Sequence, residues 1–143
     1  MTEIENLTAD LIKYFTMKKI IFTEKAPKPI GPYNQAIVNN SILYTSGQIA
    51  INPITGEFTK GTIEEETKLV MQHLSEILKA ANSNFDQVIK VSIFIKNMND
   101  FGKINLVYGS YFNEKNAPAR ETVEVARLPK DANIEISLIA FTK

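Results

Sequence analysis

The residues best suited to chemistry lie around Arg120, where a proline turn leads into a predicted strand. Pro118 fixes its own φ and biases the residue before it away from helix, so Arg120 follows a stiff, extended entry. The run 121–125 has the alternation of a short strand and places Arg120 at its start. A guanidinium held in this way offers two parallel N–H donors to a carboxylate. The alternative is that Arg120 forms a surface salt bridge, which is common for arginines.

Glu135 is the candidate partner for that arginine. It stands between Ile134 and Ile136 in the last predicted strand, and a carboxylate there could take a proton from water. A nearby arginine would favour its ionised form, as a base requires. The alternative is a solvent-facing strand residue, which the alternation with two isoleucines favours when taken alone.

The composition excludes several other chemistries. The chain has 143 residues, with 16 Lys and Arg against 16 Asp and Glu, which suits one globular domain and not a nucleic-acid binder. It has no cysteine and a single histidine, His73, so we expect no disulfide, no zinc site and no Ser-His-Asp triad. It also lacks a glycine-rich phosphate loop, and we expect no metal and no cofactor. No apolar run is long enough for a membrane span, and we expect a cytoplasmic protein without membrane contact.

Residues 1–16 are expected to form an N-terminal extension, either a short helix or a disordered segment. Apolar residues recur there at helical spacing, at Ile4, Leu7, Leu11 and Phe15. Acidic residues occupy the positions where a secretory signal would be basic. The interpretation we favour is a dispensable extension ahead of a domain spanning 17–143, and the alternative is a helix that packs on the body or on a partner.

The sequence of this domain predicts strands and helices in the order βββαβαββ. Strands are expected at 18–23, 33–38, 41–46, 88–96, 121–125 and 134–141. Thr62 and Glu65 have the spacing of a capping box, and the apolar stripe of the helix they open runs to Ala81. His73 lies off this stripe and is expected on the surface.

A second helix is expected after Asn99 and Asp100, which can cap it. Two helices among six strands predict an α+β domain, in which a mixed sheet is covered on one face. Gly47, inside a strand pattern, predicts a bulge or a close approach of the backbone.

Four spaced motifs resemble the RidA/YjgF/UK114 family of reactive-intermediate (imine) deaminases. They are Gly31-Pro-Tyr-Asn-Gln-Ala36, Tyr44-Thr-Ser-Gly-Gln-Ile49, Pro118-Ala-Arg120 with Val123-Glu-Val-Ala-Arg-Leu-Pro129, and Ile134-Glu-Ile136. They follow the family order, and the resemblance runs from about Lys18 to the C-terminus. One departure is Thr122, at a position where many relatives carry a cysteine.

The resemblance implies a chorismate-mutase-like fold and a homotrimer with sites between subunits. The implied activity is hydrolysis of 2-iminobutanoate and 2-iminopropanoate to 2-oxo acids and ammonia. Arg120 would clamp the substrate carboxylate and Glu135 would handle the proton. The resemblance places the other substrate-binding positions at Tyr33, Ser46 and Asn105.

Two alternatives to an imine deaminase remain open. The same clamp would serve a non-catalytic regulatory protein that binds 2-oxo acids or other small carboxylates. An endoribonuclease or translation inhibitor is the third interpretation, and the zero net charge disfavours it because phosphate contacts need clustered Lys and Arg.

Overall fold

The structure, a computed structural model, describes the backbone of residues 1–143 and all side chains except those of residues 14–16. Its strands are β1 (Lys19–Ile21), β2 (Ala36–Asn39), β3 (Ile42–Thr45), β4 (Val88–Ile95), β5 (Ala119–Glu124) and β6 (Ile134–Phe141). Its helices are α1 (Glu3–Thr16), α2 (Ile63–Ala80) and α3 (Phe101–Gly109), with short 3₁₀ turns between elements. From β1 onward the predicted order βββαβαββ is confirmed.

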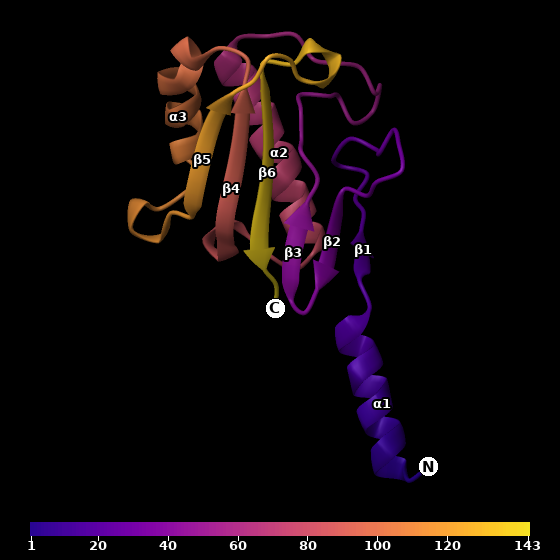
Figure 1. The fold of residues 1–143 in the computed structure, drawn as a ribbon. Helices are drawn as coiled ribbons and strands as arrows, with labels where there is room; N and C mark the ends of the chain where they lie inside the picture. Colours follow the sequence, from indigo (N-terminus) through magenta and orange to yellow (C-terminus); the bar gives the residue numbers. More distant parts are fainter.

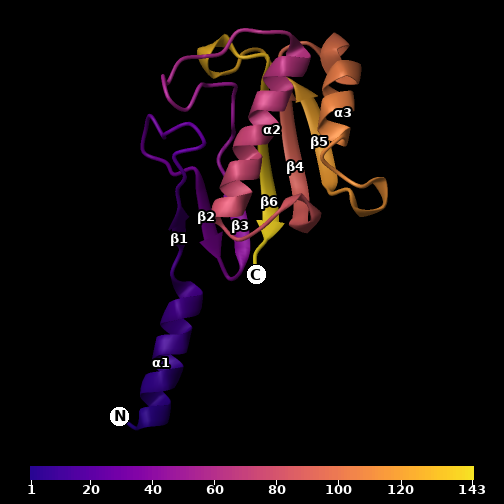
Figure 2. The same cartoon turned by 180° about the vertical axis from the view of Figure 1, so that it is seen from behind.

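The six strands form one mixed sheet in the order β1-β2-β3-β6-β4-β5. All neighbours are antiparallel except β4 and β5, which are parallel because α3 carries the chain back between them. Helices α2 and α3 cover one face of the sheet, behind it in Figure 1 and in front of it in Figure 2. The predicted α+β class, with two helices on one face, is therefore confirmed.

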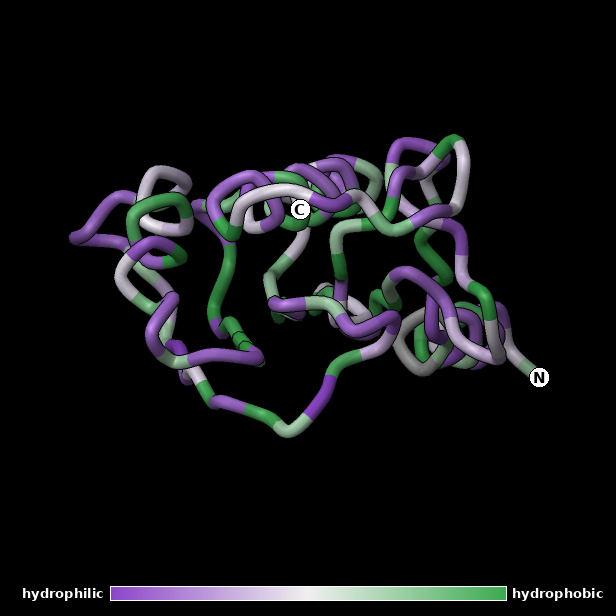
Figure 3. Tube along the Cα trace, turned by 90° about the horizontal axis from the view of Figure 1, so that it is seen from above, coloured by the Kyte–Doolittle hydropathy of each residue, from purple (hydrophilic) through white to green (hydrophobic). Residues whose placement is uncertain are grey.

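The core lies between α2 and the sheet. The predicted capping box opens α2, since Thr62 Oγ1 accepts from the Glu65 amide at 3.2 Å and the Glu65 carboxylate accepts from the Thr62 amide at 2.8 Å. The inner stripe of the helix, including Val70, Leu74 and Ile77, is fully buried. Figure 3 shows hydrophobic and hydrophilic residues interspersed along the helices, as expected for elements with one buried side.

A bulge in β4 changes one detail of the expected pattern. The alternation of apolar residues predicts that Ile89 shares the buried face with Val91, Ile93 and Ile95, but Ile89 is 46% exposed. The register shifts between Val88 and Lys90, and Val88 takes the buried position. The prediction for Ile89 is therefore wrong by this one-residue shift.

Helix α1 extends away from the sheet below β1, as Figures 1 and 2 both show. Thr2 and Glu5 form a second capping box at its start. The side chain of Phe15, part of the expected apolar spacing, lies outside the described residues. In the part of the chain that the structure describes, no helix is both long and apolar enough to cross a bilayer.

The expectation that His73 lies on the surface is wrong, because its side chain is only 2% exposed. The segment that leaves β3 turns back over α2, and the backbone of Ile51 lies within hydrogen-bonding reach of the imidazole. Burial lowers the pKa of His73 to about 4, with the Ile51 contact opposing the shift. Among the described side chains, its Nε2 atom has no hydrogen-bond partner. The apolar pattern of a helix does not show that a loop from elsewhere in the chain will cover its outer side, so the burial of His73 could not be predicted from it.

His73 is expected to make the protein less stable in mild acid. The folded state disfavours the charged imidazole, so the unfolded state binds the extra proton between the ordinary pKa of 6.5 and about 4. The free energy of unfolding should therefore fall by on the order of 3 kcal/mol as the pH drops through this window. Urea titrations at several pH values and one protein concentration would measure this slope. A His73→Gln variant should show a shallower slope, and identical slopes would contradict the assignment.

Candidate functional site

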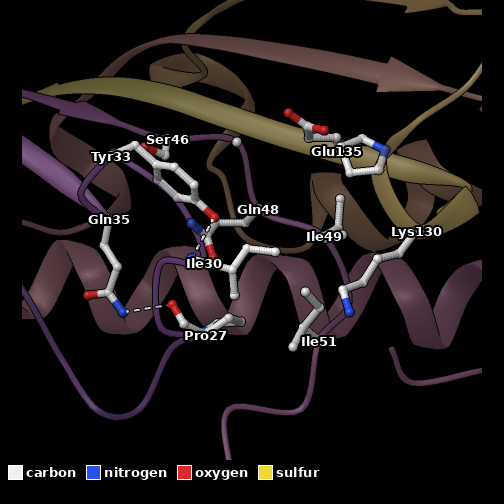
Figure 4. A pocket seen from close by; sticks show the side chains of 12 residues that line it. Pro27, Ile30, Tyr33, Gln35, Ser46, Gln48, Ile49, Ile51, Lys130 and Glu135 are labelled. Carbon is white, nitrogen blue, oxygen red and sulfur yellow. Dashed lines mark hydrogen bonds between the residues drawn. The ribbon is translucent and has the colours of Figure 1, made fainter. Parts of the chain in front are cut away.

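A pocket of about 350 Å³ opens beside the start of β6 (Figure 4). Tyr33, Ser46 and Glu135, three of the predicted site residues, line it together. The rest of the wall is mostly apolar and comes from Pro27, Ile30, Gln35, Gly47, Gln48, Ile49, Ile51, Pro129 and Lys130. A pocket with a mostly apolar wall and a few polar side chains is typical of a site that binds a small molecule.

Gln35 holds the proline-rich loop of residues 26–32, which forms one wall of this pocket. Its side chain is 1% exposed, accepts from the Thr23 amide at 2.8 Å and donates to the carbonyl of Pro27 at 3.0 Å. The side-chain nitrogen of Gln35 also donates to the carbonyls of Thr23 and Ala26, so the hydrogen-bonding groups of this side chain all have partners. The loop has little regular structure of its own, so this buried side chain gives it a defined shape.

Ser46 lies across the pocket from that loop on a similarly fixed backbone. Its amide donates to the carbonyl of Gln35 at 2.9 Å, and its hydroxyl donates to the carbonyl of Asn34 at 2.5 Å. The hydroxyl hydrogen is therefore engaged, which leaves oxygen lone pairs free to accept a hydrogen bond from substrate or water.

Gly47 makes room for Glu135. A methyl group on Gly47 would overlap the Glu135 side chain, so the predicted close approach of the backbone is confirmed. Gln48 and Ile136 exchange two backbone hydrogen bonds, of 2.8 and 3.1 Å, and hold this segment against β6. Burial raises the pKa of Glu135 above its ordinary value of 4.5, which makes the carboxylate a stronger proton acceptor.

Arg120 occupies a second, separate site beside α3. One guanidinium nitrogen donates to Asn105 Oδ1 at 2.6 Å. The guanidinium carbon lies 4.8 Å from the centre of the Tyr108 ring and 5.6 Å from that of Phe101. Burial raises the pKa of Tyr108 to about 12, with the charge of Arg120 opposing the shift. The aromatic rings and the amide orient the guanidinium and leave other N–H donors for a carboxylate.

These two sites lie on opposite faces of the sheet within one chain. Arg120 pairs with Val91 of β4, whose side chain is buried beneath the helices. Glu135 alternates with Ile134 and Ile136, which are fully buried on that same covered face, so Glu135 points to the open face. The hypothesis that Arg120 favours ionisation of Glu135 is therefore wrong within a single chain.

The sequence of this chain is similar to those of one known family. Residues 23–142 match the family model described as Endoribonuclease L-PSP. A RutC family protein of Pyrococcus horikoshii is 54% identical over 87% of this chain and 98% of its own. The rat 2-iminobutanoate/2-iminopropanoate deaminase is 44% identical over 87% of this chain and 90% of its own. The chain belongs to the RidA/YjgF family.

Among solved structures, the crystal structure of Escherichia coli TdcF with bound serine has a TM-score of 0.81 and 42% identity. The match covers 87% of this chain and 99% of TdcF. The RidA/YjgF fold expected from the sequence motifs is confirmed by this agreement.

Several residues that shape this RidA-type site were not predicted. Phe101 and Tyr108 share one helical face with Asn105, and their spacing of four and seven residues was an available signal. Within the described residues, no cluster of three His, Asp or Glu side chains is arranged to hold a metal ion.

Glu66 was also missed, because its interaction spans a large sequence separation. Its buried carboxylate accepts from the amide and from the side chain of Asn133, both at 2.8 Å. This contact ties α2 to the turn before β6, in which Lys130 and Asp131 both adopt a left-handed φ of 55°. Because Lys130 lines the pocket and Glu135 follows this turn, Glu66 helps to place both.

Replacing Gly47 with alanine should disturb the position of Glu135 more than the stability of the fold. The atoms nearest to the added methyl group are Oε1, Cδ and Cγ of the Glu135 side chain, so we expect the side chain to move and the backbone to stay in place. Any reaction that uses the Glu135 carboxylate should slow about ten- to hundredfold, since small misplacements of a reacting group are costly. The melting temperature should change little.

The matched control for Gly47→Ala is Gly109→Ala, where a methyl group would meet no atom within 4 Å. It should leave the rate of the same reaction at the wild-type value. Wild-type turnover in Gly47→Ala would show that the position of Glu135 does not matter.

Proposed function

We propose that the protein hydrolyses 2-iminobutanoate and 2-iminopropanoate to 2-oxo acids and ammonia, at sites completed between subunits of a homotrimer. One observation carries the proposal. The guanidinium oriented by Asn105 and the Glu135 carboxylate, the two groups that the reaction would use, lie on opposite faces of one sheet. Arg120 of one subunit would face Tyr33, Ser46 and Glu135 of the next.

The open face of the sheet supports a role for a second copy. Large apolar side chains are exposed there, namely Ile20 at 57%, Tyr44 at 48%, Val123 at 44% and Phe141 at 44%. Their strand partners place all four opposite the helix-covered face. An apolar sheet face of this kind marks an interaction surface, and a second copy of the chain is the partner that we propose for it.

The reaction needs one water molecule and one proton acceptor. Arg120 holds the substrate carboxylate through parallel N–H donors and presents the imine carbon to the pocket. Water oxygen bonds to that carbon as Glu135 accepts a water proton, and the C=N electron pair moves to nitrogen. Glu135 returns this proton to the nitrogen, which gives the carbinolamine. It then transfers the hydroxyl proton to the nitrogen as the C–N bond breaks, so ammonia leaves and the oxygen becomes the carbonyl of the 2-oxo acid.

No covalent intermediate is required for this sequence. Thr122 stands where a thiol is common, and its hydroxyl is buried without a hydrogen-bond partner among the described side chains. Because the hydroxyl is out of reach of solvent, it is unsuited to attack substrate. We place the activity in the cytoplasm, where pyridoxal-phosphate enzymes that act on serine and threonine would supply the imines.

A non-catalytic carboxylate-binding protein is the second candidate. The solved TdcF structure carries bound serine, so a related chain accommodates an amino acid. Release of ammonia from freshly generated 2-iminobutanoate distinguishes an enzyme from a binder. Binding of 2-oxobutanoate without ammonia release would favour the second candidate. RNA cleavage by an Arg120→Ala variant would favour neither the deaminase nor the carboxylate-binding protein.

Arg120→Lys tests the carboxylate clamp. Lysine keeps the positive charge but loses the planar fork, and one charge-assisted hydrogen bond contributes about 1.5–3 kcal/mol. We expect kcat/KM for 2-iminobutanoate to fall roughly ten- to hundredfold. Melting behaviour and oligomer mass should be unchanged, because Arg120 contacts α3 at the sheet edge. A folded variant with wild-type kcat/KM would remove the clamp from the mechanism.

Glu135→Gln tests the proton acceptor. The amide keeps the shape of the side chain and cannot accept the proton, so kcat should fall by roughly two to four decades. Because burial raises the pKa of Glu135, wild-type kcat/KM should decline with falling pH already above 4.5. The residual rate of the variant should lack that acid limb. An unchanged kcat would mean that the substrate itself or a backbone group accepts the water proton.

A further inference from the structure

Helix α1 has an apolar stripe that its own domain leaves exposed. Ile4, Leu7 and Leu11 follow one another at intervals of three and four residues, so they lie on one side of the helix. Their side chains are 77%, 65% and 52% exposed. Figures 1 and 2 show the helix standing clear of the sheet in both views.

A helix of this length needs a partner to be stable. The 14 residues of α1 are near the minimum for a helix in water, and most helical stability in proteins comes from packing an apolar face. The capping box and the acidic first turn help, but such contributions amount to about 1 kcal/mol each. The exposed stripe therefore indicates that another surface covers it.

The charges around α1 indicate which surface that is. The first ten residues carry Glu3, Glu5 and Asp10 and no lysine or arginine. At the other end of the helix, a hollow of about 370 Å³ is lined by Lys18, Lys19 and Lys143. Apolar side chains of Met17, Ile21, Val38 and Ala81 line the same hollow. An acidic helix with an apolar stripe and a basic hollow with apolar walls are complementary.

We propose that α1 pairs antiparallel with α1 of a second copy of this chain. In such a two-fold pair the acidic start of each helix reaches the lysines at the base of the other, and Leu7 of one copy packs against Leu11 of its partner. A parallel pair would instead place acid against acid and lysine against lysine. The pairing joins two oligomers and does not involve the residues of the imino acid site.

Light scattering on the full-length protein tests the pairing. Leu7→Glu places a charge against Leu11 of the partner at both ends of the proposed seam, so the variant should have half the mass of the wild type. Ile54→Glu is the matched control, since Ile54 is 92% exposed on a turn of the domain, and it should keep the wild-type mass. Equal masses for wild type and Leu7→Glu would overturn the proposal. Loss of binding to phosphatidylcholine vesicles in Leu7→Glu, without a change of mass, would assign the stripe to a lipid surface instead.

Engineered cysteines test the orientation without a charge in the seam. Because the chain has no cysteine, each introduced thiol reports one position. A mixture of Leu7→Cys and Leu11→Cys proteins should cross-link between the two variants under mild oxidation faster than either variant cross-links with itself. Faster self-linking of Leu7→Cys would indicate a parallel pair and contradict the antiparallel one.

Discussion

Alternation of side chains across the β-sheet is the constraint on which this site depends. Successive residues of a strand point to opposite faces, so the buried isoleucines on either side of Glu135 force its carboxylate onto the open face. The parallel pairing of β5 with β4 similarly directs Arg120 beneath α3. No side-chain rotation brings the two groups together within one sheet. A mechanism that uses both must therefore use two copies of the chain, and the exposed apolar residues of the open face agree with this.

Buried polar side chains give the irregular parts of the site their shape. Gln35 fixes the proline-rich loop from within, and Glu66 fixes the turn before β6 by binding Asn133 twice. Each satisfies backbone groups that would otherwise be buried without partners. The candidate catalytic residues are therefore positioned by side chains that take no part in the proposed reaction. Arg120 follows the same rule, since Asn105 and two aromatic rings orient it.

Local sequence patterns predicted the elements well and the effects of tertiary structure poorly. The capping box at Thr62, the order of elements along the chain and the close approach at Gly47 all follow from short-range chemistry. His73 and Ile89 were misplaced because a returning loop and a bulge act through tertiary structure and register. The motifs indicated Tyr33, Ser46, Asn105, Arg120 and Glu135 as one group. Only the sheet register shows that one chain divides them into two sites.

The most direct test of this division mixes two inactive variants, Arg120→Ala and Glu135→Gln. Each lacks one half of the site, so neither alone should release ammonia from 2-iminobutanoate at an appreciable rate. If the halves come from different subunits, dissociating and reassembling an equal mixture should restore about a quarter of wild-type activity, since that share of interfaces pairs two intact halves. Mixed oligomers that remain as inactive as the separate variants would contradict a site shared between subunits.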